Sequence, residues 1–182
     1  GPYAIPMDEE AAMRLLLAVC ASVPLEPNSA RAAVGRFEHL QCGYPRIEPE
    51  KDRKKLAKCI MPLDELPVGH TVGEALKQLL IFGGKGELFT YKEAETGQRK
   101  KGYTNPQVRG FLTIHFMLPL PQVRIEHQFT SWMRKIWFYG IQGSIELESY
   151  NTASRQYNLG DRARITVISE ATIEEIGAVL RT

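Results

Sequence analysis

The chain has 182 residues, 43% of them hydrophobic and 24% charged, and its formal net charge is +2. This composition is typical of a soluble globular protein and excludes a collagen-like repeat and a disordered chain. A net charge this small does not by itself indicate nucleic-acid binding, so a polyanion site would have to come from local clusters of basic residues.

Residues 1–6, before Met7, resemble the remnant of a cleaved tag and are left out of the fold. The apolar run Met13–Val23 has some features of a signal peptide, but the acidic residues just before it favour an amphipathic helix. No apolar run reaches the roughly 20 residues that span a bilayer, so membrane contact would be peripheral. The three cysteines are irregularly spaced, which favours free thiols in a reducing compartment.

The N-terminal region, residues 7–67, is predicted to be helical. A first helix spans Asp8–Ser22, and a second runs from a cap at Asn28 or Ser29 to Leu40. A third, short helix spans Glu50–Cys59, and prolines then make the segment up to residue 67 a linker. The apolar residues of the first helix surround more than one face, as expected of a helix that is deeply packed or docked on a partner; they are Met13, Leu15, Leu16, Leu17 and Val19.

The core, residues 68–182, begins with a strongly marked helix. Thr71 and Glu74 fit a capping box, apolar residues follow at helical spacing to Phe82, and Gly83-Gly84 ends the helix. The glycines around Lys85 lack the spacing of a phosphate-binding loop. A strand over Gly86–Lys92 follows, and then an exposed polar loop over Glu93–Pro106.

The next segments combine a buried strand with aromatic residues. Phe111–Leu118 alternates poorly, which predicts a strand buried on both faces. Gln122–Tyr139 is predicted to be a helix, because its large apolar residues fall at offsets of three and four. We interpret this stripe as core packing, with a partner interface as the alternative; the interface would be formed by Trp132, Arg134, Lys135 and Trp137.

Two strands and a helix complete the chain. The strands are Gly143–Tyr150 and Arg162–Ser169, the second with Ala163, Ile165 and Val167 facing inward, and the helix is Thr172–Leu180. The predicted fold class is α+β: a single domain with N-terminal helices and a small, mainly antiparallel sheet packed against helices.

No motif in the sequence indicates catalysis or a cofactor. Ser131 or a cysteine, with His115 or His127 and an acid such as Glu126 or Asp161, would supply acyl-transfer groups, but no nucleophile elbow supports them. A zinc site is conceivable because His39-x-x-Cys42 could supply half of a tetrahedral set, although the other half lacks paired spacing; it would use Cys59 and His70. Whether Cys42 and Cys59 bind metal stays open.

Basic residues form two clusters that could bind polyanions or an anionic membrane. The first is Lys51, Arg53, Lys54, Lys55 and Lys58, and the second is Arg99, Lys100 and Lys101. Clusters of this density attract phosphates and anionic lipid at physiological salt. A solvated helix face and an exposed loop are the alternative interpretations.

The order of parts resembles the core of rhabdovirus matrix proteins, with a size close to those of plant-infecting cytorhabdoviruses. The resemblance covers about Val68–Ser169. It rests on the helix ending in Gly83-Gly84, the apolar strand closed by Pro119-Leu120-Pro121, Trp132-Met133-Arg134-Lys135-Ile136, and Gly143-Ser144-Ile145-Glu146-Leu147. The Pro-Pro-x-Tyr motif and the basic N-terminal tail of animal-virus relatives are not present in this sequence.

This resemblance implies a non-enzymatic viral structural protein. Such a protein self-associates, condenses the nucleocapsid of nucleoprotein and RNA, and links it to the membrane and the glycoprotein tail. The implied location is the virion and the host cytoplasm and internal membranes, with the nucleus as an alternative. A different class is a nucleic-acid-binding regulator, for example a viral RNA-silencing suppressor, which would need a contiguous basic face on duplex RNA. A third is an interaction scaffold without a polyanion partner.

Overall fold

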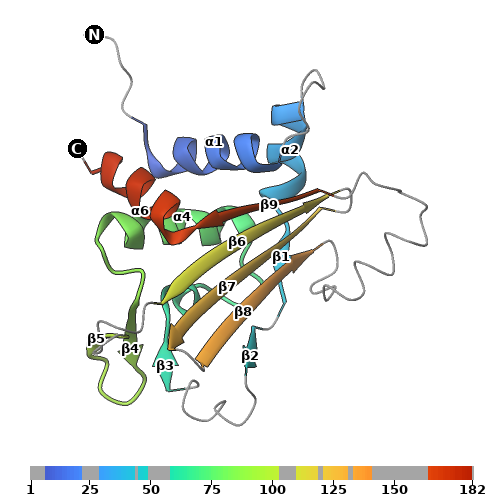
Figure 1. Ribbon diagram of the computed structural model, residues 1–182. Coiled ribbons are helices and arrows are strands. Elements are labelled where there is room, and N and C mark those ends of the chain that lie inside the picture. The colour runs from blue at the N-terminus through green and yellow to red at the C-terminus, as the bar shows by residue number, and fades with distance from the viewer. Residues whose placement is uncertain are drawn as a thin grey trace.

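Helices cover one face of a mainly antiparallel sheet in a computed structural model of the chain (Figure 1). The structure describes residues 7–21, 29–43, 45–48, 58–102, 110–118, 121–130, 133–140 and 164–181. Its helices, its large sheet and a smaller three-stranded sheet confirm the predicted α+β class.

The large sheet is built around three long central strands. β6 (Phe111–Leu118), β7 (Gln122–Thr130) and β8 (Met133–Gly140) follow one another in the chain and pair as antiparallel neighbours. β9 (Arg164–Ser169) pairs with β6 and forms one end of the sheet. At the other end, β1 (Gln41–Cys42) and β2 (Arg46–Glu48) both pair with β8.

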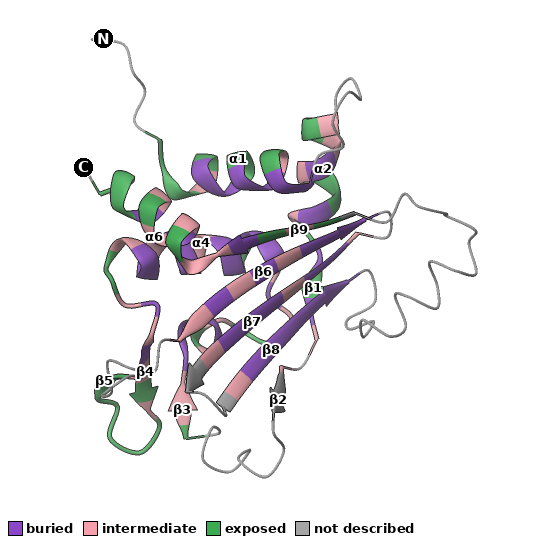
Figure 2. Ribbon diagram, in the orientation of Figure 1, coloured by how far each residue is buried: buried purple, intermediate pink, exposed green. Residues whose placement is uncertain are grey.

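Four helices in the described part of the chain pack on this framework. They are α1 (Glu9–Ala21), α2 (Ser29–Phe37), α4 (Val72–Gly84) and α6 (Glu170–Val179). Ile114, Ile125 and Trp137 stand on one face of the sheet and share a buried core with these helices (Figure 2). Phe37 of α2, for example, packs edge-on against Phe116, with ring centroids 6.0 Å apart.

The smaller sheet lies beside the core. It contains β3 (Cys59–Ile60), β4 (Thr90–Glu93) and β5 (Arg99–Lys101) in that order. A short 3₁₀ helix, η2 (Pro62–Glu65), connects β3 to the loop before α4. The predicted linker therefore contains a helical turn, with Met61 and Leu63 buried.

The capping box of α4 is confirmed. Thr71 Oγ1 accepts from the Glu74 backbone N–H at 3.3 Å, and the Glu74 carboxylate accepts from the Thr71 N–H at 2.7 Å. The pKa of Glu74 is lowered, first by that backbone hydrogen bond. The helix ends at Gly84, as the glycine pair predicted, and Gly86 has a positive φ of 66°.

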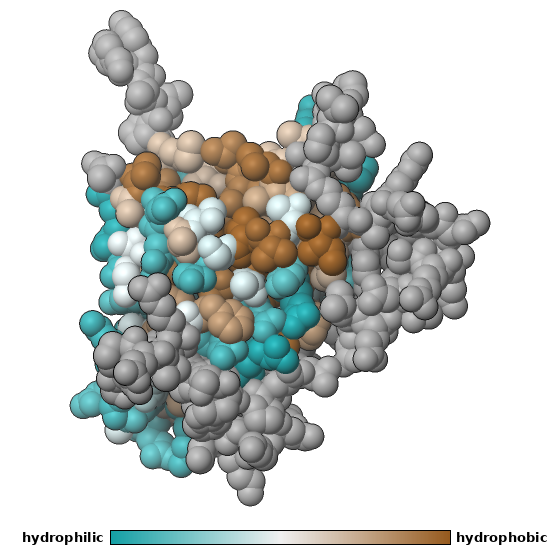
Figure 3. Space-filling model, viewed as in Figure 1, coloured by the Kyte–Doolittle hydropathy of each residue, from teal (hydrophilic) through white to brown (hydrophobic). Residues whose placement is uncertain are grey.

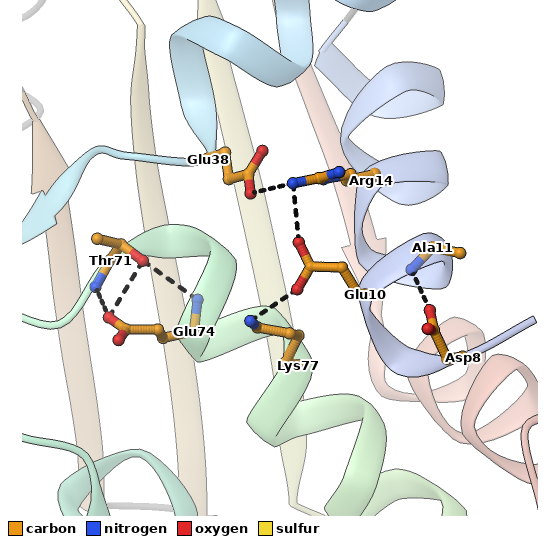
Figure 4. A network of polar contacts seen from close by, with 8 residues as sticks. All are labelled: Asp8, Glu10, Ala11, Arg14, Glu38, Thr71, Glu74 and Lys77. Carbon is orange, nitrogen blue, oxygen red and sulfur yellow. Dashed lines mark hydrogen bonds and ion pairs between the residues drawn. The ribbon is translucent and has the colours of Figure 1, made fainter.

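Polar contacts tie α1 to the elements around it (Figure 4). Asp8 Oδ1 accepts from the Ala11 N–H at 2.7 Å, which caps the first turn. Glu10 pairs with Lys77 of α4 at 2.8 Å and with Arg14 at 3.1 Å, and Arg14 also reaches Glu38 at 3.3 Å. The pKa of Glu10 is lowered, mainly by its hydrogen bond with Lys77.

The predicted helix over Gln122–Tyr139 is wrong, because β7 and β8 occupy this segment. Its apolar residues also fit a period of two: Val123 and Ile125 of β7, and Trp137 and Tyr139 of β8, all stand on the helix-covered face. Pairing with β6 decides between helical spacing and the strand period of two. In the extended conformation, the backbone N–H and C=O groups of β7 have partners on β6.

The strand predicted over Arg162–Ser169 is confirmed as β9, but its two faces are exchanged. Ile165 and Val167 were expected to face inward, yet they are 52% and 51% exposed, whereas Ile168 is buried. Ile168 is opposite Ile114 in the β6–β9 register, so the even-numbered residues of β9 face the helices. The final helix is confirmed but begins at Glu170.

Smaller differences concern the loops. The predicted strand Gly86–Lys92 is found as Thr90–Glu93, and the predicted loop Glu93–Pro106 contains β5, which pairs with β4. The second helix ends at Phe37. Most of the predicted helix Glu50–Cys59 lies outside the described residues, but Cys59 belongs to β3. The predicted strand Gly143–Tyr150 also lies outside them.

Candidate interaction surfaces

The described residues of the two basic clusters come together on the smaller sheet, where most have carboxylate partners. Lys58 pairs with Glu95 at 2.7 Å, Arg99 with Glu65 at 2.8 Å, and Lys100 with Glu93 at 2.6 Å. Lys101, the last residue of β5, is exposed. Lys51, Arg53, Lys54 and Lys55 lie outside the described residues.

These ion pairs shape the electrostatics of the hairpin formed by β4 and β5. The hydrogen bond with Lys100 is the main cause that lowers the pKa of Glu93, and it raises the pKa of Lys100 in turn. The Arg99 guanidinium lies over the Phe82 ring, 4.8 Å from its centroid, which ties the hairpin to α4. Exposed pairs of this kind contribute little to stability, because water and salt screen them.

The predicted partner interface is divided between the two faces of β8. Trp137 is 1% exposed and Lys135 is 6% exposed, and both stand on the helix-covered face. Neither presents a surface to a partner. Arg134 lies on the opposite face and pairs with Glu126 at 2.9 Å. Trp132 lies outside the described residues. The predicted aromatic stripe is not formed, because its described members lie on the strands β7 and β8 rather than on a helix.

A charged group occupies the sheet face that points away from the helices. Glu126 accepts from Arg124 at 2.6 Å and from Arg134 at 2.9 Å, so one carboxylate joins β7 to β8. The carboxylate side chain is only 8% exposed. Gln122 on the same strand is buried, and its side-chain amide has no hydrogen-bond partner among the described residues.

The side chains considered for catalysis do not form a catalytic arrangement in the described residues. His127 is buried with its ring 5.3 Å from that of Phe89, and burial, followed by the charge of Lys135, lowers its pKa to about 3. His115 is half-buried, and its Nε2 lies 3.2 Å from Thr113 Oγ1. Burial raises the pKa of the Cys42 thiol to about 12, which disfavours the nucleophilic thiolate. Ser131 and Asp161 lie outside the described residues.

The zinc candidates are not assembled in the described part of the chain, where no group of three or more possible ligands could hold a metal ion. His70 is engaged instead: its ring nitrogens lie 2.9 Å from the Pro67 carbonyl and 2.9 Å from the Tyr139 hydroxyl. When Nδ1 of the His70 ring donates to the Pro67 carbonyl, its Nε2 accepts from the Tyr139 hydroxyl. The Cys42 thiol donates to the Gly43 carbonyl at 2.9 Å.

Exposed apolar side chains gather on one side of the molecule. Of the seven large apolar residues that are exposed in the described part of the chain, six lie on α1, α6 or β9 or just before α1. We call these six the apolar flank; they are Met7, Leu15, Val19, Ile165, Val167 and Val179. Val68 is the seventh. Figure 3 shows hydrophobic side chains over α1 and again at the level of β9 and β6.

A groove between α1 and α6 forms part of this flank. Its volume is about 520 Å³, and its lining is apolar except for Thr172 and Glu175. Leu15, Leu16 and Val19 line it from α1, and Ile176 and Val179 line it from α6. Ile168 of β9 also lines the groove.

Part of this surface could be predicted from the sequence. The first helix has apolar residues on more than one face, and the structure buries Met13 and Leu17 while Leu15 and Val19 are 51% and 64% exposed. The contributions of β9 and α6 were missed. The sequence signal for β9 was its alternation, which was assigned to the wrong face.

Comparison with known proteins found no family model, no curated protein and no solved structure that matches this chain. The resemblance to rhabdovirus matrix proteins therefore stays a prediction. None of the helices in the described residues is long and apolar enough to cross a membrane.

Proposed function

We propose that this chain is a non-enzymatic viral matrix protein that self-associates, condenses the nucleocapsid and links it to an anionic membrane and the glycoprotein tail. The observation that carries the proposal is the apolar flank. Five exposed apolar side chains on two helices and a strand, together with Met7 just before α1, form a surface suited to contact with other macromolecules.

The geometry of the flank favours protein contacts. Apart from Met7, its side chains project from α1, α6 and β9, which pack on the core, so little ordering is needed when a partner binds. Large apolar side chains, once desolvated at the centre of an interface, provide most of its binding free energy. A chain that must assemble many copies needs such a surface.

The basic hairpin supports a separate contact with anionic lipid. Lys100 and Lys101 on β5 are exposed, and Lys100 pairs with the carboxylate of Glu93 at the surface. Each basic residue near an anionic membrane contributes about 1 kcal/mol of attraction, which falls as salt screens it. Lys54 and Lys55 would add to this attraction.

Liposome flotation and sedimentation test the proposal together. The protein is floated with vesicles with and without phosphatidylserine, at two salt concentrations, and its oligomeric state is followed against concentration by analytical ultracentrifugation. We expect the protein to float only with vesicles that contain phosphatidylserine, and less at the higher salt concentration. We also expect its average molecular mass to rise with protein concentration. Lys100→Glu with Lys101→Glu, and Lys54→Glu with Lys55→Glu, should each reduce flotation. A strict monomer that does not float would overturn the proposal.

A duplex-RNA gel shift distinguishes the nucleic-acid-binding alternative. A matrix protein should bind RNA weakly and without length preference, whereas a silencing suppressor should bind duplexes tightly and select their length. Lys58, Arg99 and Lys100 lie among their acidic partners Glu95, Glu65 and Glu93. Such scattered charge favours the first outcome, because duplex recognition needs a contiguous basic face.

A further inference from the structure

The free edge of β9 and the α1–α6 groove adjoin each other. β9 is the end strand of the large sheet and, within the described residues, pairs only with β6. The outer edge of an end strand presents backbone N–H and C=O groups that can pair with a further strand. β9 has the sequence RITVIS, without proline, so its own residues do not block this pairing.

The groove lies where the side chains of an added strand would go. Ile168 of β9 is one of its lining residues, together with Leu16 of α1 and Ile176 of α6. Side chains of a strand alternate between the two faces of a sheet. A strand added beside β9 would thus direct every second side chain toward the helices and the groove. The others would lie beside Ile165 and Val167, which are exposed on the opposite face.

The charges around the groove are acidic. Glu175 lines it, and Glu170 and Glu174 stand on the same helix. The start of α1 adds Asp8 and Glu9, whereas Glu10 is paired with Lys77 and Arg14. Of the nearby basic residues, Arg14 pairs with Glu10 and Glu38, and Arg181 donates to the Gly84 carbonyl at 2.6 Å. An anionic membrane or a nucleic acid would be repelled here, whereas basic residues would be attracted.

We propose that the edge of β9 and the α1–α6 groove form a binding site for an extended peptide with an apolar centre and flanking basic residues. The peptide adds a strand to the sheet through its backbone, fills the groove with alternate apolar side chains, and places its basic residues near the carboxylates of α6 and α1. The site does not depend on a viral function, and it is separate from the basic hairpin that contacts membrane.

Three synthetic peptides of about ten residues, the length of a long strand, test the site by fluorescence anisotropy. The first has a centre of alternating valine and threonine between lysine pairs, the second has glutamate in place of lysine, and the third has proline at alternate central positions. We expect the first to bind at micromolar concentration and the others at least tenfold more weakly. Equal binding of the proline peptide would overturn strand addition, and equal binding of the glutamate peptide would overturn the charge argument.

Matched variants locate the site on the protein. Glu175→Lys and Leu15→Glu should each weaken binding of the lysine peptide by about tenfold. Glu95→Lys and Val68→Glu make the same changes at exposed positions away from the flank, and they should leave binding unchanged. Hydrogen exchange adds a readout on the backbone: the peptide should slow the β9 amides that do not bond to β6. No protection in β9, or equal effects of the control variants, would contradict the site.

Discussion

Gly177 of α6 and Gly84 of α4 lie where the two helices meet in direct backbone contact. A Cβ atom added to Gly177 would lie 2.4 Å from the Gly84 nitrogen and 2.4 Å from the Leu80 carbonyl oxygen. Both are backbone atoms, so no side-chain rotation relieves the overlap. Only a residue without a side chain permits this crossing.

We expect Gly177→Ala to lower the free energy of unfolding by about 2–3 kcal/mol, because α6 must move away from α4. Urea denaturation measures this change. Gly35→Ala in α2 is the matched control: an added Cβ meets nothing within 4 Å there, so the better helix former should stabilise by up to about 1 kcal/mol. Equal effects of the two substitutions would show that the helices do not cross as described.

His127 should make the fold sensitive to acid. Burial, followed by the charge of Lys135, lowers its pKa from 6.5 to about 3 in the folded protein. Between these two pH values the unfolded chain binds a proton that the folded chain does not, so stability is present above pH 6.5 and is lost as the pH falls. The expected slope is about 1.4 kcal/mol per pH unit.

Urea denaturation at several pH values measures this slope, and His127→Leu should reduce it. Burial also lowers the pKa of the half-buried His115, so some slope should remain. His39→Gln, which removes an exposed histidine instead of a buried one, is the matched control. A slope that survives His127→Leu in full would assign the acid sensitivity to other groups.

At the scale of single elements, hydrogen bonds between two residues three positions apart, Thr71 and Glu74, fix the start of α4. Thr71→Ala removes the hydroxyl that accepts from the Glu74 N–H and should cost about 1 kcal/mol of unfolding free energy, measured by thermal or urea unfolding. Thr71→Ser keeps an acceptor at the same position and should cost less. If both variants lost the same stability, the cause would be the methyl group and not the cap.

Elements defined by short-range signals were predictable, and those defined by pairing were not. The cap of α4 lies within four residues, and Phe111–Leu118 is a mainly apolar run interrupted only by Thr113 and His115, so both were found in the sequence. Gln122–Tyr139 satisfies helical spacing and strand alternation at once. Only the register with β6, which places Ile125 opposite Ile114, selects the strand pair. The two faces of β9 were exchanged for the same reason: its register with β6 could not be read from the sequence. Ile165 and Val167 were therefore expected to be buried and were not recognised as part of the apolar flank.

At the scale of the whole molecule, segments far apart in the chain depend on one another. β1 and β2, from the N-terminal region, pair with β8, and β3 pairs with β4. Acidic residues border the apolar flank. Exposed basic residues lie instead on the hairpin of the smaller sheet, in β5. In our two proposals, this separation of charge assigns the basic peptide and the anionic membrane to different surfaces.

One buried ion pair joins the N-terminal region to the large sheet. Lys135 Nζ of β8 lies 2.5 Å from Asp64 Oδ2 of η2, and the two side chains are 7% and 17% exposed. Asp64 also accepts from the Met61 N–H at 2.9 Å. The pair is therefore largely shielded from water, and it belongs to the turn that leads from β3 toward α4.

Asp64→Ala should lower the free energy of unfolding by about 3 kcal/mol, because it leaves the Lys135 ammonium buried without its partner. Urea denaturation of the full chain gives the value. Asp64→Leu with Lys135→Met removes both charges and should recover much of the loss, since an apolar pair needs no compensation. Glu95→Ala breaks the exposed pair with Lys58 and should cause no measurable change. If the double variant were less stable than Asp64→Ala alone, the specific geometry of the pair, and not the isolated buried charge, would hold the N-terminal region against the sheet.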